Sequence, residues 1–339
     1  MYVLGVDGGT SKTLAIIAQT DGTIVGMGRR GGSNIYTAET HTALANAVDA
    51  SLDALVSAGI ASRDVIVGAF SMSGGDWPED FAFIQSTMED QGLGQRIMVI
   101  NDAVGGLRAG SRDGVGVAVI CGTGVATVAR NADGLSWHTS FWQGAAGAVD
   151  LAQKTLRAVY RADLAIDPPT ALTPAVLDFF CAKHVEEILR RGTARDTTGL
   201  GDYSGLARVL LTVADDGDDT ARRIVEAHGY ELGEYALAAA KKVNMEGQPF
   251  PLVLAGGVFR HPTLLLVDAL AAKVRTAFPD ITIVHSQFEP VIGALLLAYE
   301  NIGVRVDDAL LAQIKATLMT EHEFDVATAY DNIVQSTVE

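Results

Sequence analysis

The chain has 339 residues, of which 48% are hydrophobic, 36 are glycine and 9 are proline, and 41 acidic against 25 basic side chains give a formal net charge of −16. This length exceeds the size at which a single core usually stops growing, so two domains are expected. The glycine content is high, but the few prolines exclude collagen-like and Pro/Gly-rich low-complexity chains. The negative charge disfavours nucleic acid as a partner, because that binding depends on Lys and Arg at phosphates.

The cysteine content and the apolar runs indicate the compartment. Two cysteines, Cys121 and Cys181, are too few for a disulfide-stapled secreted domain, which favours a reducing environment. Residues 2–6 are typical of a buried strand and unlike a signal peptide. Apolar stretches such as 292–298 fall far short of the ~18–20 residues of a membrane span. We therefore expect a cytoplasmic protein with no membrane partner; whether it forms a homodimer is left open.

Short apolar runs alternate with longer amphipathic segments along the chain. The predicted strands are 3–6, 14–18, 24–28, 65–70, 97–100, 116–121, 126–130, 252–255 and 281–284. The predicted helices are 38–58, 80–91, 148–161, 174–191, 219–243, 262–278 and 290–299. Strands alternating with helices indicate an α/β protein.

Two segments repeat one pattern at matching spacing. Residues 6–13 (VDGGTSKT) lie between two predicted strands and are followed by an Asp-Gly turn at 20–22. Residues 120–127 (ICGTGVAT) also lie between two strands and are followed by an Asp-Gly turn at 132–134. A tandem duplication would place two Gly-rich turns face to face across a cleft.

Both Gly-rich turns are suited to phosphate. Without Cβ atoms, backbone N–H groups can approach a bound anion closely, and Thr hydroxyl groups add donors. Neither turn matches the P-loop pattern G-x-x-x-x-G-K-[ST] or the dinucleotide pattern G-x-G-x-x-G. For either segment alone, a simple hairpin turn is the alternative, and the duplication is what favours a polyphosphate site.

Two aspartates stand at the ends of predicted strands. Asp7 ends an apolar strand, where a carboxylate is costly unless paired, and a Mg²⁺ held mostly through water is the expected partner beside phosphates. A cap of the following turn is the alternative for Asp7. Asp102 follows the strand at 96–100, and ligands bind at the carboxyl ends of strands in open α/β sheets. The N-cap of the next helix is the alternative for Asp102.

Three further Gly-rich loops adjoin predicted elements. Gly256 and Gly257 follow the strand at 252–255, where absent side chains leave room for an adenine or ribose, or for close packing of strand on helix. Residues 73–76 (SGGD) form a polar loop after the strand at 65–70. Residues 31–34 (GGSN) precede the first helix, and a plain linker is the alternative there.

Taken together, these motifs resemble the actin-like ATPase superfamily of sugar kinases, chaperone ATPases and actin. The nearest branch is the BadF/BadG/BcrA/BcrD ATPase family with its N-acetylglucosamine kinase-like members. The resemblance covers about the first 300 residues: phosphate motifs at 6–10 and 122–124, sugar-side loops at 32–34 and 73–76, a catalytic segment at 101–103, an adenosine motif at 255–258 and a closing helix at 290–294.

The resemblance implies a fold and a domain division. The fold would be α/β with two actin-like, ribonuclease H-like domains, each a mixed five-stranded sheet flanked by helices, separated by a cleft. We expect an N-terminal domain at 1–114 on the sugar side, a C-terminal domain at 115–300 with the adenosine motif, and a helical extension at 301–339.

The resemblance also implies an ATP-dependent sugar kinase that phosphorylates a hydroxyl of a hexosamine, N-acetylglucosamine or glucosamine, or a related sugar. Asp102 would be the general base, and Asp7 would hold Mg²⁺ through water. The expected ATP and phosphate contacts are Gly8, Gly9, Thr10, Lys12, Gly122, Thr123, Gly124, Gly256 and Gly257. The expected substrate contacts are Asn34, Ser73, Gly74, Gly75, Asp76, Asn101 and Gln143.

The chain departs from the family on the acceptor side. Where the family usually carries Gly-Asp-Glu-Gly-Ser, residues 144–148 read GAAGA, and Val125 and Ala126 replace the usual Ser-Asn after the second phosphate motif. These changes remove hydrogen-bonding groups, and such groups discriminate strongly among substrates. Gln143 and Asp150 are candidates to supply other contacts, while core packing is expected for Trp142.

Two alternatives stay open beside the sugar kinase. One is a BadF-type ATPase that activates a partner through a cysteine-ligated cluster, which is disfavoured because Cys121 lies in a predicted strand and Cys181 alone in a predicted helix. The other is a degenerate member that binds nucleotide or sugar without turnover, which the alanines at 144–148 favour and the retained Asp7 and Asp102 oppose.

Overall fold

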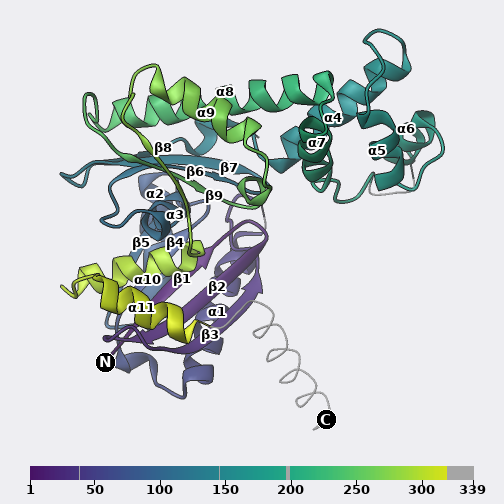
Figure 1. Cartoon of the computed structure of the whole chain (residues 1–339). Coiled ribbons are helices and arrows are strands. Elements are labelled where there is room, and N and C mark those ends of the chain that lie inside the picture. Colours follow the sequence, from purple (N-terminus) through teal and green to yellow (C-terminus); the bar gives the residue numbers. More distant parts are fainter. Residues whose placement is uncertain (38, 145, 196–198, 319–339) are drawn as a thin grey trace. The chain divides into compact units, whose positions relative to one another are not determined.

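The computed structural model describes residues 1–37, 39–144, 146–195 and 199–318. The chain forms two compact units, one of Met1–Ala109 with the segment that begins at Phe288, and one of Gly110–Gln287. Each unit contains a mixed sheet of five strands flanked by helices (Figure 1). The expected α/β fold with two such sheets is confirmed.

The sheet of the first unit has the order β3-β2-β1-β4-β5. Its strands are β1 (Tyr2–Gly8), β2 (Lys12–Gln19), β3 (Ile24–Gly31), β4 (Val65–Met72) and β5 (Arg96–Asn101). β1, β2 and β3 are antiparallel neighbours, whereas β4 and β5 run parallel to β1. The carboxyl ends of β1, β4 and β5 therefore meet at one edge, where Asp7, the loop after Met72 and Asp102 lie.

Alternating side chains of this sheet pack into two hydrophobic layers. Leu4 and Val6 face a layer shared with α1 (Thr40–Ala58) and α2 (Pro78–Asp90). Val3 faces the opposite layer, shared with α10 (Pro290–Asn301) and α11 (Asp308–Thr317). The period of two expected for a strand buried on both faces accounts for this division. The remaining elements are the short helix η1 (Ser62–Asp64) and α3 (Asp102–Gly110), which follows β5 directly.

The sheet of the second unit repeats the topology of the first. Its strands are β6 (Gly116–Cys121), β7 (Val125–Arg130), β8 (Ser136–His138), β9 (Pro251–Ala255) and β10 (Thr282–His285), in the order β10-β9-β6-β7-β8. β7 is antiparallel to β6 and β8, and β9 is parallel to β6 and β10. The duplicated pattern expected from the two Gly-Thr turns is therefore present, and β8 is the strand that follows the Asp-Gly turn at 132–134.

Helices α8 (Asp219–Lys242) and α9 (Leu265–Arg275) lie side by side in the second unit, as Figure 1 shows. Its other helices are α4 (Ala148–Asp163), α5 (Leu172–Phe179), α6 (Val185–Gly192) and α7 (Leu206–Asp215), with the short η2 (Ser140–Gln143) and η3 (Val258–Arg260). The single helix predicted at 174–191 is wrong, and α7 was not predicted. The predicted helix is interrupted between α5 and α6. The exposed Cys181 lies in this interruption with φ +50°, so Cys181 is outside a helix.

The structure assigns α10 to the first unit, not to the second as the expected boundary at residue 300 implied. The reason is packing, because α10 buries Val291, Ile292 and Leu295 in the layer shared with β1 and β4. α11 joins the same layer through Leu310, and Gln313 Nε2 donates to Thr23 Oγ1 at 2.9 Å. The acidic residues beyond Leu318 lie outside the described residues.

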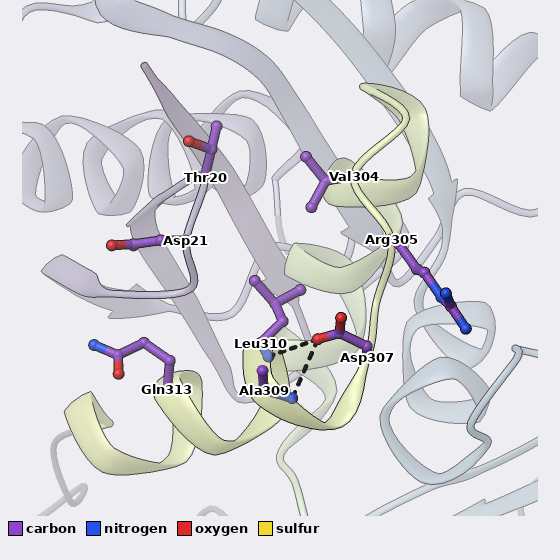
Figure 2. A pocket seen from close by; sticks show the side chains of 8 residues that line it. All are labelled: Thr20, Asp21, Val304, Arg305, Asp307, Ala309, Leu310 and Gln313. Atoms are coloured by element: carbon purple, nitrogen blue, oxygen red, sulfur yellow. Dashed lines mark hydrogen bonds between the residues drawn. The ribbon is translucent and has the colours of Figure 1, made fainter.

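A groove of about 460 Å³ lies between the β2–β3 turn and the start of α11 (Figure 2). Asp307 begins α11 there, and its Oδ1 accepts hydrogen bonds from the backbone N–H groups of Ala309 and Leu310. None of the lining residues belongs to the predicted phosphate or sugar contacts. Among the described residues, no helix has the length and hydropathy needed to cross a bilayer.

Candidate active site

The first Gly-rich turn joins β1 to β2. The Gly9 N–H donates to the Lys12 carbonyl at 2.9 Å, while the N–H groups of Thr10 and Ser11 donate to no described residue. A Cβ on Gly8 would lie 2.4 Å from Ser33 Oγ, so glycine is required there by packing. The turn thus presents two free backbone donors at an exposed position, as the phosphate interpretation requires.

The loop after β3 packs on this turn and brings the predicted sugar-side residues next to it. The Ser33 N–H donates to the Gly9 carbonyl at 2.9 Å, and a Cβ on Gly32 would lie 2.0 Å from the Thr10 carbonyl oxygen. Asn34 Nδ2 then donates to Ser73 Oγ at 2.9 Å. Loops that are far apart in the sequence therefore meet at the carboxyl end of β1.

The loop at Ser73–Asp76 follows β4 and is fixed at both ends. The Ser73 N–H donates to the Gly8 carbonyl at 2.7 Å. Gly74 has φ +87°, and a Cβ there would lie 2.9 Å from Ile35, so both backbone and packing require glycine. The N–H groups of Asp76 and Trp77 donate to Asp80 Oδ2.

Two supporting residues of this loop were not predicted. The Tyr36 hydroxyl group donates to the Asp80 carboxylate at 2.9 Å, which ties the loop after β3 to the start of α2. Asp80 in the first helical turn was a capping signal in the sequence, but its contact with Tyr36 spans 44 residues of chain and has no local signature. The pair holds Asp76 beside Asp102.

The Asn101 side chain makes three hydrogen bonds within the protein. Its Nδ2 donates to the Gly75 carbonyl and to Asp76 Oδ1, both at 3.0 Å, and its Oδ1 accepts from the Ala103 N–H at 3.1 Å. The side chain is buried. Asn101 therefore caps α3 and orients Asp76.

Asp102 begins α3 and is half-buried. Burial, followed by the nearby charge of Asp76, raises the pKa of Asp102 to about 6, although hydrogen bonds from the Ala103 backbone and the Ser73 side chain act in the opposite direction. A carboxylate whose pKa lies near neutrality is suited to accept a proton and release it again.

Asp7 pairs across the sheet with Ser71 and is also half-buried. Burial, and then the charge of Asp102, raises the pKa of Asp7 to about 7; Glu289 acts in the same direction, and Lys12 opposes it. Glu289, just before α10, was not a predicted site residue. This excess of negative charge suits a divalent cation. Among the described residues, no three His, Cys, Asp or Glu side chains lie close enough together to hold a metal ion by themselves.

The second Gly-rich turn joins β6 to β7 and packs on the start of α4. The Ala148 N–H donates to the Gly122 carbonyl at 2.8 Å and the Val149 N–H to the Thr123 carbonyl at 3.3 Å. In the described part of the chain, the N–H groups of Thr123 and Gly124 have no acceptor. The two turns thus share the property of exposing unpaired backbone donors.

The glycines of the second unit separate into two kinds. Gly256 has φ +94°, and a Cβ there would lie 2.4 Å from the Cys121 carbonyl oxygen, so the fold requires glycine. At Gly122, Gly124 and Gly257 a Cβ would meet no described atom within 4 Å. The fold does not explain these three, whereas a bound nucleotide approaching the backbone would.

The altered loop at 144–148 lies directly behind the second turn. A Cβ on Gly147 would lie 2.5 Å from the Gly124 backbone, and Ala145 lies outside the described residues. Gln143 is 3% exposed, and its Oε1 accepts from Thr139 while its Nε2 has no described partner. Trp142 is 71% exposed, so the expectation of core packing for Trp142 was wrong. Asp150 is engaged in an ion pair with Lys154 at 2.7 Å.

Residues 4–298 match the sequence model of the BadF/BadG/BcrA/BcrD ATPase family. The chain belongs to this family. The predicted family membership is confirmed, and ATP is the nucleotide that the family name implies.

Two curated relatives extend the match over nearly their whole length. The N-acetylmuramic acid/N-acetylglucosamine kinase of Clostridium acetobutylicum is 25% identical over 305 residues, with 88% of this chain and 98% of the relative covered. The N-acetyl-D-glucosamine kinase of Dictyostelium discoideum is 25% identical over 314 residues, with the same coverage of 88% and 98%.

Solved structures share the fold. A candidate N-acetylglucosamine kinase from Chromobacterium violaceum superimposes with a TM-score of 0.64 at 24% identity, covering 88% of this chain and 98% of the other. A ROK hexokinase from Thermus thermophilus has a TM-score of 0.54 at 14% identity, with 89% and 99% covered. At these identities the likeness establishes the actin-like sugar kinase fold.

Proposed function

We propose that this protein is an ATP-dependent sugar kinase that phosphorylates a hydroxyl group of a hexosamine, N-acetylglucosamine or glucosamine, or of a related sugar. The observation that carries the proposal is Asp102, whose pKa is raised to about 6 at the carboxyl end of β5, beside a cluster of polar side chains. The enzyme class, a carbohydrate kinase, agrees with the names of both curated relatives.

Asp102 is assigned the role of general base. It would take the proton of the sugar hydroxyl whose oxygen attacks the γ-phosphorus of ATP, with ADP leaving. A positioned base typically contributes ~10²- to 10⁴-fold to such a reaction. A pKa of about 6 leaves Asp102 mostly ionised at pH 7 while keeping it more basic than an exposed aspartate.

The acceptor would bind where Asn34, Ser73 and Asp76 lie. Asn34 and Ser73 are hydrogen-bonded to each other at 2.9 Å, and Asp76 Oδ1 is oriented by Asn101. These groups offer both donors and acceptors, which suits the hydroxyl groups of a sugar. The names of both curated relatives favour an N-acetylated amino sugar, and the altered loop at 144–148 is the reason to test related sugars as well.

The two Gly-Thr turns are proposed to bind the ATP phosphates, and Gly256 and Gly257 the nucleoside. The unpaired N–H groups of Thr10, Thr123 and Gly124 are suitable donors. Asp7 would hold Mg²⁺ through water, with Lys12 as a further phosphate contact. Bound Mg²⁺ would neutralise phosphate charge during transfer. We retain the cytoplasmic location as a prediction and leave the homodimer open.

The test is a coupled ADP-release assay with Mg-ATP over a panel of amino sugars, hexoses and polyols. We expect sugar-dependent turnover that is highest with an amino sugar. Asp102→Asn should lower kcat at least ~10²-fold, whereas Asp21→Asn, an exposed turn carboxylate in the same unit, should leave it unchanged. Binding without turnover on any sugar would favour the degenerate member that only binds nucleotide or sugar. ATP hydrolysis at a rate that does not depend on sugar would favour a BadF-type ATPase.

A further inference from the structure

The loop after β3 contacts the Ser73–Asp76 loop and the helix that follows it. Asn34 Nδ2 donates to Ser73 Oγ at 2.9 Å. The Tyr36 hydroxyl group donates to the Asp80 carboxylate, 2.9 Å from Oδ2 and 3.0 Å from Oδ1, in the first turn of α2. The proposed reaction gives Asn34 and Ser73 a role in binding the sugar, but it gives none to Tyr36 or Asp80.

The Asp80 carboxylate accepts hydrogen bonds from two separate segments of the chain. Besides the Tyr36 hydroxyl group, its Oδ2 accepts from the N–H groups of Asp76 and Trp77, at 3.2 and 2.9 Å. Asp80 is only 8% exposed, so water replaces a lost donor poorly. Without the Tyr36 hydroxyl group, the carboxylate gains hydrogen bonds by rotating toward water, and this rotation moves Oδ2 away from the two N–H groups.

Asp76 connects this network to the proposed sugar contacts. Its N–H donates to Asp80, and its Oδ1 accepts from Asn101 Nδ2 at 3.0 Å. Hydrogen bonds thus fix both the backbone and the side chain of Asp76. A loop that is already ordered binds its ligand without the cost of ordering, whereas a loop that is ordered only part of the time binds with lower apparent affinity.

We propose that Tyr36, acting through Asp80, is a positioning residue that holds the Ser73–Asp76 loop in the conformation that binds the sugar, and so sets the affinity for the acceptor. The inference rests on the proposed function and deepens it. Because bound sugar itself keeps the loop ordered, loss of the Tyr36 hydroxyl group should affect KM for the sugar more than kcat.

The first experiment is Tyr36→Phe, which removes only the hydroxyl group. Tyr36 is 48% exposed, so the variant should fold. KM for N-acetylglucosamine, KM for ATP and kcat are measured by the coupled assay. We expect KM for the sugar to rise about fivefold, which is within the range for one hydrogen bond, while kcat and KM for ATP stay within about twofold of wild type.

The second experiment measures the loop without any substrate, by hydrogen–deuterium exchange. The N–H groups of Asp76 and Trp77 donate to Asp80, so they are protected only while this contact is made. In Tyr36→Phe, we expect the peptide that covers residues 73–80 to exchange about fivefold faster at these two N–H groups. Peptides from α8 and α9 of the second unit should exchange as in wild type.

Tyr230→Phe is the matched control. Tyr230 is 49% exposed, and its hydroxyl group is also bonded to a charged side chain, since Lys273 Nζ donates to it at 2.7 Å. Tyr230 lies on α8 of the second unit, so its substitution should leave both KM for the sugar and exchange at residues 73–80 unchanged.

Asp80→Ala tests whether Tyr36 acts through Asp80. In wild type, Tyr36→Phe should raise KM for the sugar about fivefold, but in the Asp80→Ala background it should raise it by less than about twofold, because the acceptor of the hydroxyl group is already gone.

Three results would overturn the inference. They are unchanged KM for the sugar in Tyr36→Phe, unchanged exchange at residues 73–80 in that variant, and an effect of Tyr36→Phe that is equally large in the Asp80→Ala background. Faster exchange with unchanged KM for the sugar would leave the proposed kinase standing. If the wild type phosphorylates no sugar, the proposed function fails and the claim about sugar affinity with it, while the exchange experiment still decides whether Tyr36 holds the loop.

Discussion

Gly293 of α10 lies against Gly105 of α3 so closely that a Cβ on Gly293 would be 1.8 Å from the Gly105 carbonyl oxygen. The same two helices are joined by the ion pair between the buried Arg108 and Glu300, with Nε and Oε1 2.7 Å apart. Because α3 begins with Asp102, the position of α10 determines where the proposed base lies.

Gly293→Ala should therefore reduce both stability and turnover. The clash is with backbone, which cannot rotate away, so we expect a loss of about 3 kcal/mol in the free energy of unfolding. Displacement of α3 should lower kcat tenfold or more, since a misplacement of ~1 Å can cost ~10²-fold. Denaturant unfolding and the coupled assay measure the two effects.

The control is Gly233→Ala at the α8–α9 contact, where a Cβ would lie 2.8 Å from the Leu270 carbonyl oxygen. It should destabilise the protein without a specific loss of kcat in the fraction that remains folded. Equal losses of kcat in both variants would mean that the contact between α3 and α10 has no special relation to Asp102.

Alanine substitutions at Gly256 and Gly257, adjacent glycines in the predicted adenosine motif, should differ in their effects on stability and on KM for ATP. Gly257 has helical backbone angles, φ −62° and ψ −30°, and open space beside it, so Gly257→Ala should leave the melting temperature unchanged or raise it slightly. If a nucleotide approaches this backbone, the new methyl group should raise KM for ATP about tenfold.

Gly256→Ala supplies the comparison. A residue other than glycine at φ +94°, with its Cβ 2.4 Å from the Cys121 carbonyl oxygen, should cost about 2–3 kcal/mol in the free energy of unfolding. Unchanged KM for ATP in a stable Gly257→Ala protein would contradict the assignment of this motif to the nucleotide.

The glycine motifs were predictable because their signals are local. A Gly-Thr turn between two strands, repeated at the same distance from an Asp-Gly turn, was sufficient to predict the duplicated sheet and the two turns that expose unpaired backbone donors. The position of Asp7 and Asp102 at one edge of the sheet was predictable for a similar reason, since each ends or directly follows an apolar strand, and strand ends in α/β proteins gather at one edge.

The remaining features depend on contacts that no local pattern encodes. Tyr36 reaches Asp80 across 44 residues, and Lys154 reaches His228 across 74. The position of α10 was misassigned because it follows the last strand of the second sheet in sequence but packs on the first sheet. Trp142 was expected in the core because large apolar residues are usually buried, which is an average and not a property of each residue.

In the absence of Mg²⁺, Asp7→Asn should increase the free energy of unfolding of the protein. The pKa of Asp7 is raised from 3.8 to about 7 in the folded chain, so the folded state loses stability from this group as pH rises from about 4 to 7. The amide removes that charge, and we expect a gain of about 1–2 kcal/mol at pH 8, allowing for partial solvent screening.

Mg²⁺ should raise the melting temperature of the wild type more at pH 8 than at pH 5, because the cation binds the ionised carboxylate. In Asp7→Asn this increment should be absent. The melting curves with and without Mg²⁺ at both pH values form the test. An equal Mg²⁺ increment in the variant would place the cation elsewhere.

The pH dependence of kcat/KM should report the ionisation of Asp102. A general base acts in its ionised form, so kcat/KM should fall as pH decreases through about 6, the pKa of Asp102. The charge of Asp76 is one cause of the raised pKa, so Asp76→Asn should shift this limb to lower pH. Asp21→Asn, remote from these causes, should leave it in place. A limb that stays fixed in Asp76→Asn would mean that another group controls the acidic limb.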